Sequence, residues 1–169
     1  MKKKRLKISR LVPPGFDYGP ELKALCWIVG GALVLSLFWF TDLREARRAL
    51  FDRYLGVLRP IPGAVMRDFG KMVWPYMSGF AVAALWALSF VGVHYQYHHR
   101  VSKSIYTMKR LPNRLELHLR CWTLPLSCFA AILLAGFLLL LIYYAVYLLV
   151  TPAENLAPDQ WKKLWSVIL

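Results

Sequence analysis

Charged residues are scarce in this sequence, and three long stretches have almost none. Asp, Glu, Lys and Arg make up 18% of the 169 residues, whereas a soluble domain has about 25%. Residues 73–93 and 124–150 contain no charged side chain, and residues 22–40 contain only Lys23. A bilayer core of about 30 Å needs roughly 20 helical residues. The shortage of charge therefore argues against a soluble domain and predicts three membrane-spanning helices.

Recognisable catalytic motifs are also missing. The sequence has no HExxH, GxSxG or GxxxxGK[ST] pattern and no Ser/His/Asp triad signature. The three apolar runs contain no Asp or Glu, which argues against an ion-coupled transporter because such proteins carry ionisable groups within their spans. We therefore expect a protein that is not an enzyme, binds no cofactor or metal and cannot hydrolyse ATP by itself.

Cysteine is scarce too, since the chain has only Cys26, Cys121 and Cys128. Their number is odd and no CxxC pair occurs, so a disulfide framework is not expected. All three fall within or at the ends of the predicted spans. We interpret them as small apolar residues of membrane helices.

The fold class predicted from these runs is an all-α integral membrane protein with three transmembrane helices. An interfacial amphipathic helix over residues 43–58 is expected between the first two, because apolar residues recur there at helical spacing with arginines on the other side. The predicted segments are a basic tail (1–21), a first span (22–41), an outer amphipathic connection (42–72), a second span (73–97), a cytoplasmic loop (98–120), a third span (121–150) and an outer amphipathic tail (151–169).

Basic residues dominate the remaining charge, with a formal net charge of +13. Residues 1–23 carry seven Lys or Arg against two acids, and residues 98–120 carry six against one. Three alternating spans put both clusters on the same side, where the positive-inside rule predicts the cytosol. Residues 42–71 oppose this orientation with seven basic residues against four acids. We expect a multi-pass protein of the cell membrane with its N-terminus inside, and no nucleic-acid partner.

Two spans carry further signals. The second is rich in small residues, which permit close helix–helix approach: Ser78, Gly79, Ala81, Ala83, Ala84 and Ala87. Near the outer end of the third span, Tyr143, Tyr144 and Tyr147 predict an aromatic belt at the membrane interface.

Histidines cluster in the stretch HYQYHHR, where His94 and His98 are four residues apart and share a helix face. Two such histidines can bind Zn²⁺ only with a third or fourth ligand. His118 is available across the loop, and Glu116 is the only acid nearby. We favour interfacial anchoring or partner contact for His94, His98 and His99 over a metal site.

The basic loop contains the segment SKSIYTMKRLPNRLE. Residues 104–108 predict a short helix, which Leu111-Pro112 breaks, and Asn113 can cap a new helix with Glu116 three residues on. This pattern resembles the loop between helices two and three of ABC-2 type transporter permeases, where a short helix precedes Leu-Pro, a small or polar residue, Arg and an acid. Here Leu111, Pro112, Asn113, Arg114 and Glu116 stand at those places.

The resemblance implies an exporter subunit whose loop acts as a coupling helix in a groove of an ATP-binding cassette subunit. The family has about six spans per permease, so a three-span chain implies another transmembrane permease chain or a second copy as partner. Apolar anchors with a rim of cations would make the contact. The expected docking residues are Lys103, Ser104, Tyr106, Met108, Lys109, Arg110, Leu111, Pro112, Asn113, Arg114 and Glu116.

A second interpretation stays open. The loop cations satisfy topology and attract anionic lipid at about 1 kcal/mol each without any protein partner. The chain would then be a non-transporting structural or regulatory membrane protein that binds anionic lipid or another membrane protein.

Overall fold

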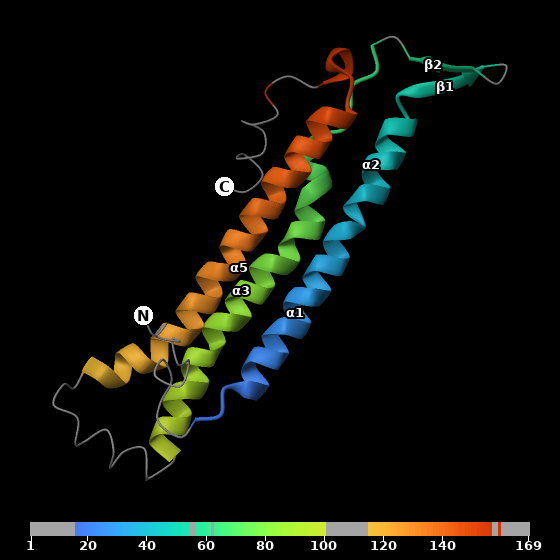
Figure 1. The fold of residues 1–169 in the computed structure, drawn as a ribbon. Coiled ribbons are helices and arrows are strands. Elements are labelled where there is room, and N and C mark those ends of the chain that lie inside the picture. The colour runs from blue at the N-terminus through green and yellow to red at the C-terminus, as the bar shows by residue number, and fades with distance from the viewer. Residues whose placement is uncertain (1–15, 55–56, 62, 101–114, 157–158, 160–169) are drawn as a thin grey trace, which may run out of the picture. The chain divides into compact units, whose positions relative to one another are not determined.

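The computed structural model describes residues 16–54, 57–61, 63–100, 115–156 and 159. Helices dominate this part of the chain, as predicted (Figure 1). The elements in chain order are α1 (Gly19–Leu37), α2 (Trp39–Arg48), β1 (Phe51–Tyr54), β2 (Val57–Pro60), α3 (Phe69–Arg100), α5 (Leu115–Val150) and a 3-10 turn (Ala153–Asn155).

Three helical segments are long and apolar enough to cross a membrane, which confirms the number predicted from the sequence. They are Gly19–Arg48, Phe69–Tyr97 and His118–Val150. Each begins a few residues before the predicted span. The first also ends later than residue 41, because α2 continues the helical path of α1.

The junction between α1 and α2 is a tightened turn rather than a break. Phe38 keeps right-handed helical dihedrals (φ −65°, ψ −18°), and the Thr41 N–H donates to the Phe38 carbonyl at 2.9 Å. Such i→i+3 bonds are typical of 3-10 geometry. Beyond the turn, Trp39 and Leu43 are buried, whereas Arg44, Arg47 and Arg48 are exposed.

The amphipathic helix is shorter than the sequence predicted. It ends at Arg48 instead of continuing to residue 58, and β1 and β2 form an antiparallel hairpin in which Phe51 pairs with Pro60 and Tyr54 with Val57. The prediction was wrong from Phe51 onward. Over segments as short as these strands, the spacing of apolar residues does not distinguish a helix from a hairpin.

The described chain divides into two compact units, and each is considered alone. The first comprises Met1–Val29 and Ala81–Leu133. It brings together the start of α1, the end of α3 and the start of α5. Its buried side chains are largely small or polar, among them Ala83, Ala84, Ala87, His94 and Cys121. Ala83, Ala84 and Ala87 thus lie in helix packing, as predicted for α3, whereas Ala81 is exposed.

The second unit comprises Gly30–Phe80 and Leu134–Leu169, and its core is aromatic. Trp39 stacks on Tyr143 with ring centres 4.6 Å apart and planes 8° apart. The Tyr143 and Ser36 hydroxyls are 3.0 Å apart, and the Tyr147 hydroxyl donates to the Arg67 carbonyl at 3.0 Å. Tyr143 and Tyr147 are buried core residues and do not form the predicted interfacial belt, and Tyr144 is half-buried.

Close helix contacts in this unit involve two glycines. A Cβ placed on Gly79 of α3 would lie 3.3 Å from the Cβ of Ala32 on α1, and one on Gly136 of α5 would lie 3.2 Å from the Cβ of Phe80. Both distances are tighter than ordinary contacts between carbon atoms. The small residue at position 79 therefore permits the close approach predicted for this helix.

A hydrogen-bonded contact ties the segment after α5 to the segment before α3. The Met66 N–H donates to the Asn155 carbonyl at 2.8 Å, and the Asn155 side-chain amide donates to the Ala64 carbonyl at 2.6 Å. The predicted amphipathic tail beyond these residues, like most of the basic tail 1–21, lies outside the described residues.

Candidate functional site

The main buried polar cluster of the first unit joins α1 and α3. Nε2 of His94 lies 3.0 Å from Oε2 of Glu21. His94 is fully buried and Glu21 is 8% exposed. A buried carboxylate paired with a buried imidazole is uncommon, because removing either group from water is costly unless its partner compensates.

The third helix contributes a backbone carbonyl made available by a proline. Pro125 lies inside α5 and has no N–H, so the carbonyl of Cys121, four residues earlier, lacks its usual helical donor. Nδ1 of His94 lies 3.0 Å from that carbonyl oxygen. The His94 side chain on α3 thus supplies the hydrogen bond that Pro125 cannot make within α5.

The chemistry of the partner atoms limits which of them can donate a hydrogen bond. A carbonyl oxygen can only accept, so Nδ1 of His94 carries a hydrogen and donates it to Cys121. The contact between Nε2 and Glu21 Oε2 then needs one further proton, either on a cationic imidazole or on a neutral carboxyl group. Each ring nitrogen of His94 thus lies within hydrogen-bond distance of an oxygen atom, one on α1 and one on α5.

The second carboxylate oxygen of Glu21 lacks a comparable contact. Oε1 is buried and has no hydrogen-bond partner among the described residues. Around the carboxyl group lies a narrow crevice lined by Leu22, Leu25, Phe90, Leu124, Pro125 and Cys128. Phe16 approaches the His94 ring edge-on, with ring centres 4.7 Å apart. This apolar lining strengthens each polar contact that is made and increases the cost of each one that is missing.

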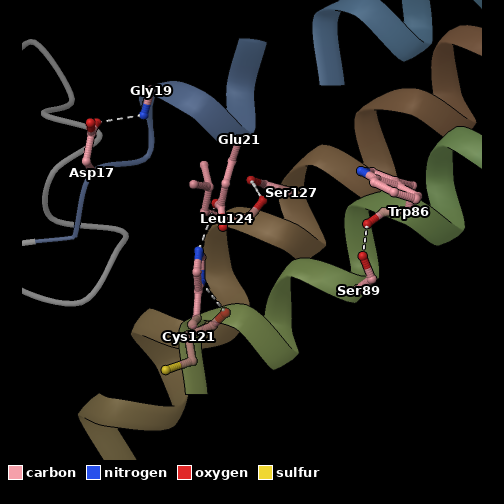
Figure 2. A network of polar contacts seen from close by, with 9 residues as sticks. Asp17, Gly19, Glu21, Trp86, Ser89, Cys121, Leu124 and Ser127 are labelled. Carbon is pink, nitrogen blue, oxygen red and sulfur yellow. Dashed lines mark hydrogen bonds and ion pairs between the residues drawn. The ribbon is translucent and has the colours of Figure 1, made fainter. Parts of the chain in front are cut away.

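Figure 2 shows how the local chain presents Glu21 toward Cys121 and Leu124. The Gly19 N–H donates to Asp17 Oδ1 at 2.9 Å, which satisfies a free donor at the start of α1. Glu21 stands two residues later, in the first turn, where a negative charge is favoured by the helix dipole. The arrangement ties three helices together.

A second polar cluster connects the ends of α3 and α5. The hydroxyl of Tyr95 lies 2.5 Å from Nδ1 of His118, and the indole N–H of Trp122 donates to the same hydroxyl at 3.3 Å. The end of α3 and the beginning of α5, which flank residues 101–114, are thus held against each other.

The predicted docking segment is almost entirely outside the described residues. This applies to Lys103, Ser104, Tyr106, Met108, Lys109, Arg110, Leu111, Pro112, Asn113 and Arg114. Glu116 lies in the first turn of α5, consistent with the new helix expected after Leu111-Pro112. Docking at these residues remains a prediction.

The predicted role of the histidines needs correction at one position. His94 is fully buried against Glu21 and Cys121, so it does not serve as an interfacial anchor. Across the described part of the chain, no three His, Cys, Asp or Glu side chains gather as a metal site would require. The side chains of His98 and His99 lie outside that part.

Sequence reasoning missed Glu21 because it began the first span at Leu22. The helix itself begins three residues earlier, at Gly19, and therefore includes Glu21. One signal could have found the pair. The start of a first span and the end of a second lie on the same side of a membrane. Glu21 and His94 would therefore be expected at the same membrane depth.

Comparisons of the chain with protein families, curated proteins and solved structures find no match.

Proposed function

We propose that the chain is a three-span membrane subunit that serves as the permease-like part of an ABC-type exporter. Residues 102–116 dock an ATP-binding cassette subunit, and a second permease chain or a second copy completes the pathway. The observation that supports this best is the pairing of α3 and α5 through Tyr95, His118 and Trp122. It gives the basic segment between them two anchored ends.

Anchored ends are what a coupling element needs. A force applied to a loop reaches the membrane helices only if the loop is attached to elements that move as units. Here the two flanking helices contact each other within one to two turns of the loop. The bonds from His94 to Glu21 and Cys121 extend this attachment to α1, so movement of the loop would be felt by all three helices.

The helix surfaces support assembly in lipid with other chains. Large apolar side chains are exposed along each helix, including Trp27 on α1, Trp86 on α3 and Phe137 on α5. In water such surfaces are a liability, whereas in a bilayer they face acyl chains or neighbouring helices.

Copurification in mild detergent tests the proposal. The tagged chain should recover an ATP-binding cassette subunit, identified by mass spectrometry and by ATP hydrolysis. Arg110→Glu combined with Leu111→Asp should abolish recovery while leaving membrane insertion intact, because it reverses a rim charge and removes an apolar anchor.

Arg67→Glu combined with Ile61→Asp is the matched control. It makes the same two kinds of change at exposed positions in the connection between α1 and α3, and the partner should still be recovered. Recovery that survives the Arg110 and Leu111 changes would place docking elsewhere. If the wild-type chain recovers no ATPase, the structural or regulatory alternative is favoured.

A further inference from the structure

A pocket at the end of α2 is lined by three arginines. Arg44, Arg47 and Arg48 border a space of about 510 Å³ together with Phe51 of β1. All three arginines are exposed, and their spacing of three and four residues puts them on one side of the helix. The volume falls within the roughly 300–1,000 Å³ usual for small-ligand sites.

Three cations within one helical turn repel one another unless an anion joins them. The negative end of the helix dipole at Arg47 and Arg48 offsets only part of this repulsion. The nearby carboxylate of Asp42 already accepts a hydrogen bond from the Tyr76 hydroxyl at 2.7 Å. No described carboxylate forms an ion pair with any of the three guanidinium groups. Planar guanidinium forks match the oxygens of phosphate particularly well.

The helix face leading to the pocket indicates the kind of phosphate. Leu33 and Leu37 precede Arg44 by eleven and seven residues, a spacing that places all three on the same side of a nearly continuous helix. Leu33 is 45% exposed and Leu37 is 58% exposed. This helix face is apolar at Leu33 and Leu37 and cationic at Arg44. It therefore complements a phospholipid, whose acyl chains are apolar and whose phosphate is anionic.

We infer that Arg44, Arg47 and Arg48 bind the phosphate of a phospholipid whose acyl chains lie along Leu33 and Leu37. Phe51 closes the apolar side of the pocket. The inference rests on the membrane placement of α1 in the proposed function, and it is independent of any ATP-binding partner. It also gives a role to basic residues that the positive-inside rule does not expect in this connection.

Native mass spectrometry of the full chain in detergent, titrated with phosphatidylglycerol, measures this binding. Replacing Arg44, Arg47 and Arg48 together by Gln should weaken it at least about tenfold. Replacing the same three residues by Lys should give an intermediate loss, because the charge remains and the fork is removed. The side chains are exposed, so all variants should keep the wild-type circular dichroism spectrum.

A control variant with Lys23, Arg67 and Lys71 changed to Gln removes the same number of exposed charges elsewhere. It should bind within about twofold of wild type. Equal losses in the two Gln variants would overturn the site in favour of general charge attraction. Inorganic phosphate should compete only weakly, and a free phosphate ion that binds as tightly as the lipid would overturn the phospholipid assignment.

Discussion

The imidazole of His94 lies 3.0 Å from the carboxyl group of Glu21, 73 residues away in the sequence, with both groups buried. The two residues should therefore be strongly coupled in stability. Glu21→Ala or His94→Ala alone should lower the free energy of unfolding by at least about 1–3 kcal/mol, because each leaves a buried polar partner without its hydrogen bond. The double variant should cost much less than the sum. Denaturation by SDS in mixed micelles measures the stability of the wild type, the two single variants and the double variant. Additive losses would contradict the pairing.

The contact between Nε2 of His94 and Glu21 leads to a second prediction, on conservative replacement at position 21. In Glu21→Gln the side-chain amide can donate to Nε2 of a neutral His94, so the hydrogen bond is retained. Glu21→Leu keeps a similar size but has no donor, which leaves Nε2 unpaired at a cost of about 1–3 kcal/mol. Gln should therefore be clearly more stable than Leu in the same titration. The reverse order would mean that His94 needs no donor there.

Close contact between α1 and α3 can be tested at Gly79. A leucine at this position would collide with Ala32, and we expect a loss of about 1–3 kcal/mol in unfolding free energy. Gly31→Leu is the matched control, since a Cβ at Gly31 meets nothing within 4 Å in the described structure. Equal effects at the two glycines would argue against this helix packing.

The Tyr143 ring should contribute at least as much to stability as its hydroxyl group does. The Ser36 hydroxyl already donates to the Leu33 carbonyl at 2.7 Å, so Tyr143 is the donor in its contact with Ser36. Tyr143→Phe removes one hydrogen bond and should cost about 1 kcal/mol. Tyr143→Leu also removes the stack on Trp39 and should cost at least about 1 kcal/mol more. A larger loss for Phe than for Leu would contradict this ranking.

The sequence was informative about the long helices and about their small residues. Uninterrupted apolar length predicted the three long helices, and Leu111-Pro112 followed by Asn113 predicted a new helix, which begins at Leu115. The small residue at Gly79 correctly indicated close packing.

Features that depend on distant residues were not predictable in the same way. The partner of Glu21 is on another helix. The Cys121 carbonyl can accept a hydrogen bond from His94 only because Pro125, four residues later, has no N–H. Tyr143 and Tyr147 are of the residue type found in interfacial belts, but their hydrogen-bond partners on other segments hold them in the core. The hairpin was also missed although its pairing is local, with Phe51 opposite Pro60, because its apolar residues are spaced as on a helix face.

The location of the basic loop is the most direct test of the account. In a chain whose three natural cysteines are replaced by serine, a single cysteine is placed at Ser104 or at Arg47. A membrane-impermeant maleimide applied to intact cells should label the Arg47→Cys protein and not the Ser104→Cys protein, which should react only after the cells are opened. Labelling of Ser104→Cys in intact cells would put the loop outside and would contradict docking to an ATP-binding subunit.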